Sequence, residues 1–101
     1  MDRLGVGILG LGTAGRLMIP ALADHPRARL AALADTDRDV REQLAALHRV
    51  PACAGIEELL ARPDVDAVYV ATPTMLHSAH VKAAAAAGKH ILVEKPMAGS
   101  V

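Results

Sequence analysis

Aromatic side chains are almost absent from this chain of 101 residues, which contains Tyr69 but no Phe and no Trp. The core must therefore be built from aliphatic side chains, and hydrophobic residues make up 52% of the sequence. That fraction is typical of a folded protein rather than a disordered one. The length is enough for one domain around one core, so we expect residues 1–101 to form a single domain.

Cysteine is nearly absent as well, since Cys53 is the only one. A disulfide within the chain and a metal site built on several thiolates are both excluded, and a reducing compartment is the default. No secretory signal pattern opens the sequence, and no apolar run approaches the roughly 18 residues of a membrane span. We therefore expect a cytoplasmic location and no membrane partner.

Net charge is also lacking, because eleven basic side chains balance eleven acidic ones. This balance argues against a nucleic-acid partner, which needs clustered Lys and Arg. His77 and His80 have the i, i+3 spacing of some metal ligands. No Asp, Glu or Cys lies near them in sequence to complete a ligand set, so we expect no metal.

What the sequence does have is an alternation of short apolar runs and longer helical patterns. Continuous apolar runs of this length are typical of strands whose two faces are both covered, as in a parallel sheet. The expected strands are Leu4–Leu9, Arg29–Ala34, Ala67–Ala71 and His90–Val93, with a brief one near 51–54. The expected helices are Ala14–Ala23, Asp37–His48, Ile56–Ala61 and Leu76–Ala87. This order predicts an α/β fold with a doubly wound parallel sheet, the Rossmann dinucleotide-binding fold.

A glycine-rich turn, G-x-G-x-x-G, joins the first expected strand to the first expected helix. Gly10 permits the tight turn, Gly12 lets a pyrophosphate approach bare backbone, and Gly15 lets the helix lie close to the strand. Backbone N–H groups at the start of the helix, including those of Thr13 and Ala14, favour an anion there. The alternative is a strand-to-helix loop that binds no ligand.

Asp35 strengthens the dinucleotide interpretation because it ends the second expected strand, 20 residues after Gly15. A carboxylate there accepts hydrogen bonds from the hydroxyls of the adenosine ribose. The alternative role is the N-cap of the next helix, for which both Asp35 and Thr36 are suited. The anionic Asp35 favours NAD over NADP, whereas Arg38 nearby could accommodate the 2′-phosphate of NADP.

Two further segments follow expected strands, at the edge of the sheet where such folds bind ligands. Ala71-Thr72-Pro73-Thr74 follows the strand at 67–71, and Thr72 or Thr74 could cap the helix that contains His77. Glu94-Lys95-Pro96 follows the last strand, where a lysine could donate a proton to a carbonyl beside a nicotinamide. The alternatives are a structural turn for the first segment and a solvated charge pair for the second.

Taken together, these motifs resemble the Gfo/Idh/MocA oxidoreductase family, over residues 4–97. The most specific matches are 65–77 (VDAVYVATPTMLH) and 87–98 (AGKHILVEKPMA). Thr74 departs from the asparagine that the family often has there. Within the family, 17–22 (LMIPAL) and 93–98 (VEKPMA) look most like dehydrogenases of dihydrodiol-type or 4,5-dihydroxyphthalate-pathway acids.

The resemblance implies roles for particular residues. Those expected to hold the cofactor are Gly10, Gly12, Thr13, Ala14, Gly15, Asp35, Thr72, Pro73, His77, Glu94 and Lys95. Lys95 is also the expected catalytic residue, and its bond to Pro96 is expected to be cis.

The resemblance also implies an activity for the intact enzyme. It would transfer hydride between NAD, or NADP, and a secondary alcohol or ketone carbon of a sugar, cyclitol or dihydrodiol-type molecule. Family members continue into a second α/β domain that holds the substrate and the homo-oligomer interface, and we expect this chain to lack it. The alternative function is a free-standing dinucleotide-binding sensor, or a module that a partner completes.

Overall fold

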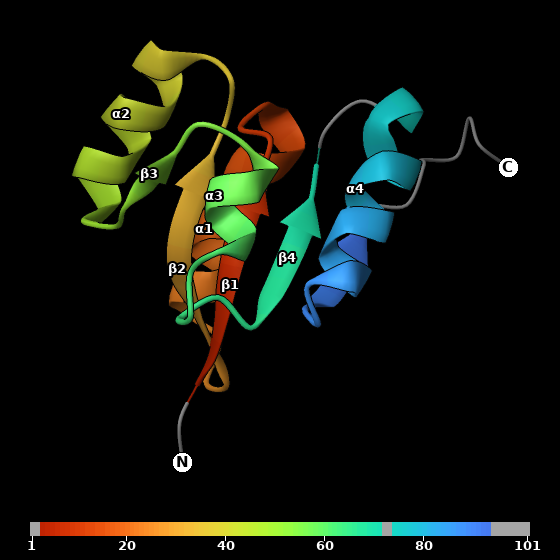
Figure 1. The fold of residues 1–101 in the computed structure, drawn as a ribbon. Coiled ribbons are helices and arrows are strands. Elements are labelled where there is room, and N and C mark those ends of the chain that lie inside the picture. The colour runs from red at the N-terminus through yellow and green to blue at the C-terminus, as the bar shows by residue number, and fades with distance from the viewer. Residues whose placement is uncertain (1–2, 72–73, 94–101) are drawn as a thin grey trace, which may run out of the picture.

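The computed structural model describes residues 3–71 and 74–93, which form one parallel sheet with helices on both faces (Figure 1). The strands are β1 (Leu4–Leu9), β2 (Ala28–Ala34), β3 (Ala52–Cys53), β4 (Ala67–Val70) and β5 (His90–Val93). The helices are α1 (Thr13–Ala23), α2 (Arg38–His48), α3 (Ile56–Leu60) and α4 (Thr74–Ala86).

The five strands lie in the order β3-β2-β1-β4-β5, so the chain starts in the middle of the sheet and builds outward twice. This is the doubly wound order, and the predicted fold class is confirmed. The four longer strands end in one row, because Leu9 pairs with both Ala34 and Val70, and Val70 pairs with Val93. The segments that follow these strands therefore start from one edge of the sheet.

Aliphatic side chains fill both faces of the sheet. Val6 and Ile8 point to the face covered by α1 and α2, where Ile19 and Leu22 pack against them. On the other face, Leu59 of α3 packs among the valines of β4 and belongs to the second core cluster. In the part of the chain that the structure describes, no polar or charged residue is classed as buried. The only aromatic residue, Tyr69, lies in the first cluster and is 9% exposed.

Most element boundaries match the expectations to within one or two residues. Gly88 has φ of +76°, as expected for the left-handed residue that ends a helix. Helix α4 begins two residues earlier than expected, so Thr74 is its first residue rather than a cap before it. The N-cap of α2 is Asp37, whose carboxylate accepts from the backbone N–H of Val40 at 3.2 Å. The alternative that Asp35 or Thr36 caps this helix is therefore wrong.

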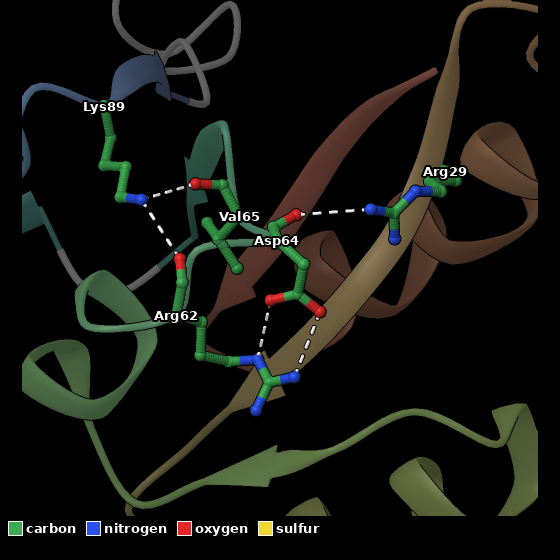
Figure 2. Close-up of polar contacts among 5 residues, drawn as sticks. All are labelled: Arg29, Arg62, Asp64, Val65 and Lys89. Carbon is green, nitrogen blue, oxygen red and sulfur yellow. Dashed lines mark hydrogen bonds and ion pairs between the residues drawn. The ribbon is translucent and has the colours of Figure 1, made fainter. Parts of the chain in front are cut away.

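The loop 62–65, which leads into β4, is tied to its surroundings from two sides (Figure 2). The ammonium group of Lys89, just before β5, donates to the backbone oxygens of Arg62 at 3.1 Å and Val65 at 2.6 Å. From the other side, a guanidinium nitrogen of Arg29 lies 3.4 Å from the backbone oxygen of Asp64. The loop thus connects β2, β4 and β5 on the side of the sheet where these strands begin.

The residues that the structure describes, 3–71 and 74–93, include four helices. None of their helices is long and apolar enough to cross a membrane. None of their His, Cys, Asp and Glu side chains form a group of three or more that could hold a metal ion.

Candidate functional site

The glycine turn 10–15 connects β1 to α1 at the row where the strands end. Gly10 has φ of +97°, a conformation that side-chain-bearing residues rarely adopt, and its N–H donates to the backbone oxygen of Ala34 at 2.9 Å. Gly12 is the N-cap of α1 and provides no side-chain hydrogen bond to the helix. The N–H groups of the first helical turn, on Thr13, Ala14 and Gly15, have no partner within the helix. They are placed to bind an anion.

The surroundings of the last two glycines fit a bound pyrophosphate. A Cβ atom on Gly15 would collide with the backbone oxygen of Gly10, so glycine is required for α1 to lie this close to β1. A Cβ atom on Gly12 would meet no atom within 4 Å. The space beside the Gly12 backbone is therefore open, and the first turn of α1 contains no acidic residue that would repel a phosphate.

Asp35 follows β2 directly and is half-buried, as expected for a residue at the same edge. Its carboxylate contacts the glycine turn, because Oδ2 accepts from the backbone N–H of Leu11 at 2.7 Å. The other oxygen, Oδ1, accepts from the backbone N–H of Asp37 at 2.8 Å. Each carboxylate oxygen has a second lone pair, so the group can still accept from a ribose hydroxyl.

Two arginines at this site were not identified from the sequence. Arg16, in the first turn of α1, donates from Nε to the backbone oxygen of Leu11 at 2.8 Å. Arg41 of α2 donates from Nη1 to the backbone oxygen of Asp35 at 3.1 Å. The position of Arg16, directly after the third glycine, was the only signal in the sequence that could have identified it.

The second half of the expected site is only partly described. His77 lies in the first turn of α4, but its side chain is outside the described residues. Thr72 and Pro73, and Glu94 and Lys95 with the expected cis bond to Pro96, also lie outside them. The structure therefore brings together Gly10, Gly12, Gly15 and Asp35, and the binding or catalytic roles of all the expected site residues stay predictions.

Cys53 is the one cysteine, and it does not belong to this site. It is 3% exposed and packs with β2 and β4 in the core. Burial raises the pKa of its thiol, which lowers the fraction of reactive thiolate at neutral pH. It is a packing residue rather than a nucleophile.

Comparison with known proteins agrees with this geometry. Residues 4–101 match the GFO_IDH_MocA family model, described as an oxidoreductase family with an NAD-binding Rossmann fold. The match starts at β1 and covers nearly the whole chain, including the glycine turn, Asp35 and the Glu94-Lys95-Pro96 segment.

Individual relatives are similar over the same region. The 1-carboxy-3-chloro-3,4-dihydroxycyclohexa-1,5-diene dehydrogenase of Comamonas testosteroni is 45% identical over 94 residues, which cover 92% of this chain and 24% of that enzyme. The crystal structure of GenD2 from gentamicin A biosynthesis, in complex with NAD, superposes with a TM-score of 0.88 at 35% identity. It covers 96% of this chain and 28% of that one.

A second solved structure holds the other nicotinamide cofactor. The 3-ketoreductase of Actinomadura kijaniata, in complex with NADP and TDP-benzene, superposes with a TM-score of 0.88 at 34% identity, covering 95% of this chain and 30% of that one. The chain spans about a quarter of the length of the Comamonas relative described above. Because the family model matches residues 4–101 and the strand order is that of a Rossmann fold, the chain belongs to the Gfo/Idh/MocA oxidoreductase family and forms its NAD-binding Rossmann domain.

Proposed function

We propose that this chain binds the cofactor of an oxidoreductase that moves hydride between a nicotinamide and a carbon bearing a secondary alcohol or ketone. The observation that carries the proposal is the open space at Gly12, next to the N–H groups of the first turn of α1 and to Asp35. When bound, the nicotinamide accepts or supplies the hydride. The residues of this chain hold the cofactor and move the proton.

The cofactor contacts follow from the geometry of the turn. A bound pyrophosphate would lie against Gly12 and would accept hydrogen bonds from the N–H groups of residues 13–15. The carboxylate of Asp35 accepts from the adenosine ribose hydroxyls. Because that carboxylate is anionic, it disfavours the 2′-phosphate of NADP, and we propose NAD as the preferred cofactor. The exposed guanidinium of Arg38, at the first residue of α2, is the group that would reduce this preference.

Lys95 is the proposed catalytic residue, supported by its place two residues after β5 in a chain that belongs to this family. In the oxidation direction, Lys95 in its neutral form would accept the proton of the substrate hydroxyl as that carbon becomes a ketone, and a bound nicotinamide would take up the hydride. Thr72, Pro73, His77 and Glu94 are proposed to line the cofactor site. A homo-oligomeric whole protein and a cytoplasmic location stay predictions from the sequence.

The proposed substrate class is a sugar, a cyclitol or a dihydrodiol-type molecule. The name of the Comamonas relative describes a dehydrogenase of a dihydroxylated, carboxylated cyclohexadiene, and it supports the dihydrodiol type. Relatives are three to four times longer than this chain, so substrate contacts from further residues belong to the proposal. We expect the 101-residue chain alone to show negligible turnover.

Cofactor binding is tested by titrating the 101-residue chain with NADH and NADPH and following nicotinamide fluorescence. We expect saturable binding of both, on the order of tenfold tighter for NADH, because a phosphate beside Asp35 places two like charges close together. Equal or tighter binding of NADPH would overturn the NAD preference. Absence of binding to either would overturn the cofactor proposal.

Catalysis is tested in the whole protein, after the source DNA has been read in frame past codon 101. Lys95→Met should reduce kcat by about a hundredfold or more, as loss of a general acid–base does, while NADH affinity changes little. An unchanged kcat would remove Lys95 from the mechanism. A stop directly after codon 101 would favour the alternative of a binding module without catalysis of its own.

A further inference from the structure

The peptide groups of Leu11, between the first two glycines of the turn, are held by two charged side chains. Its N–H donates to Asp35 Oδ2 at 2.7 Å, and its carbonyl oxygen accepts from Arg16 Nε at 2.8 Å. We propose that Asp35 and Arg16 act as positioning residues that fix the phosphate-binding turn before the cofactor arrives. We call Leu11, Asp35 and Arg16 together the Leu11 clasp.

The turn has particular need of such a clasp. Gly10 and Gly12 flank Leu11, and glycine has more backbone freedom to lose on ordering than any other residue. Leu11 itself is anchored, because its side chain is 2% exposed and lies in the core that α1 covers. A turn that is already ordered loses less entropy when it binds a ligand, so the clasp favours tight binding.

The Asp35 carboxylate is itself oriented from the α2 side. Its second oxygen accepts from the N–H of Asp37 at 2.8 Å, and its backbone oxygen accepts from Arg41 at 3.1 Å. The clasp therefore connects the glycine turn to Asp35, 24 residues later in the sequence. Asp35 is in turn bonded to the start of α2. Loss of the carboxylate should loosen the turn in addition to any effect on the ribose.

This inference rests on the proposed dinucleotide binding, and it differs from the simpler view that Asp35 acts on the ribose alone. A cofactor without adenosine ribose hydroxyls separates the two views. The probe is an NAD analogue whose adenosine ribose is 2′,3′-dideoxy, compared with NAD by titration calorimetry. If Asp35 acted only on the ribose, Asp35→Ala would bind this analogue as tightly as the unsubstituted chain does.

We expect instead that Asp35→Ala weakens binding of the dideoxy analogue about tenfold or more, the usual effect of losing a hydrogen bond to a charged group. Arg16→Ala should weaken NAD and the analogue by similar factors, because Arg16 bonds to the backbone of the turn at Leu11. Arg27→Ala is the matched control, since it removes one exposed positive charge from the turn before β2, at the opposite edge of the sheet. It should leave both affinities within about twofold.

A second measurement needs no ligand. In the ligand-free chain, hydrogen exchange followed by NMR should show a protected Leu11 N–H, with at least tenfold faster exchange in Asp35→Ala and faster exchange in Arg16→Ala. The N–H of Val68, in the interior strand β4, reports whether each variant is folded. Unchanged exchange at Leu11 with unchanged binding of the analogue would overturn the clasp. Failure of the unsubstituted chain to bind NAD would overturn the proposed function, while the exchange data would still test the clasp.

Discussion

Gly12 and Gly15 lie three residues apart in one turn, but their surroundings differ. A methyl group on Gly15 would collide with the backbone oxygen of Gly10, which cannot move without displacing the turn. Gly15→Ala should therefore lower the free energy of unfolding by about 1–3 kcal/mol, as overpacking does. Gly12 has φ of −74° and open space around it, so Gly12→Ala should cost about 1 kcal/mol or less.

Ligand binding should show a different pattern from stability in this pair of variants. Gly12→Ala should reduce NADH affinity at least about tenfold, because its methyl group occupies the space that a phosphate needs. Urea unfolding and NADH titration on the two variants measure both effects. A Gly12→Ala chain that is stable and binds NADH normally would contradict the assignment of this turn to the pyrophosphate.

Asp64 gives the fold a predictable response to acid. Hydrogen bonds from the guanidinium of Arg62, both at 3.0 Å, hold the pKa of this carboxyl below its usual range. A carboxyl whose pKa is lowered by folding stabilises the fold above the pKa of the unfolded chain, about 3.9. That stability is lost as the pH falls through the lower pKa of the folded state.

Asp64→Asn should therefore lower the free energy of unfolding at pH 7, and the difference should shrink as the pH falls through the lowered pKa of folded Asp64. The side chain is 35% exposed, and solvent weakens the pair, so we expect a difference of about 1 kcal/mol or less. Urea unfolding from pH 7 to 3 measures it. Asp24→Asn, an exposed carboxyl after α1, is the control, and an equal effect there would contradict a specific role for Asp64.

At the scale of the elements, the loop 62–65 before β4 is held by one side chain. Lys89 holds the backbone oxygens of Arg62 and Val65, and Val65 is fully buried (Figure 2). Lys89→Met keeps the aliphatic part of the side chain but leaves both oxygens without this donor. We expect a loss of about 1–3 kcal/mol in the free energy of unfolding, measured with urea. The control, Lys82→Met on the exposed side of α4, should change it by about 0.5 kcal/mol or less.

Equal stability of the two lysine variants would show that Lys89 contributes no more than a surface charge. Hydrogen exchange adds a local test, because loosening of the loop should speed exchange in β4 and β5 before it affects β2. Uniform change across the sheet would contradict a local tie.

Strand β5 is one of the two edge strands of the sheet that the structure describes. It lies at the end of the strand order and pairs only with β4 among the described strands. Leu92 lies opposite Tyr69 on the face of the sheet that α1 and α2 cover elsewhere, yet it is 45% exposed. An unpaired edge strand with an exposed leucine favours association between copies.

We therefore expect the 101-residue chain to self-associate as its concentration rises, and light scattering measures this. Leu92→Lys should weaken the association about tenfold or more, because it places a charge on the edge strand β5. Leu47→Lys on α2, where the side chain is 71% exposed, is the matched control and should have little effect. A chain that stays monomeric at high concentration would contradict this prediction.

Sequence by itself determined the elements and their order in this protein. The apolar runs at 4–9 and 90–93 match β1 and β5, because a strand covered on both faces needs a continuous apolar stretch and little else. The glycine spacing and Asp35 likewise identified the turn and the acid at its edge. These features depend on residues close together in the chain, which is why local patterns reveal them.

Tertiary structure decided how those parts are joined. Neither the contact of Asp35 with Leu11 nor that of Lys89 with Val65 follows from local spacing, since each spans 24 residues. Both exist because neighbouring parallel strands are in register: the ends of β1 and β2 bring Asp35 beside the glycine turn, and the starts of β4 and β5 bring Lys89 beside the loop 62–65. The same placement bonds Asp35 to the glycine turn, while Asp37 caps α2. A shift of one residue in register would have broken the Asp35–Leu11 and Lys89–Val65 bonds, because a hydrogen bond tolerates only tenths of an ångström and a strand advances about 3.3 Å per residue.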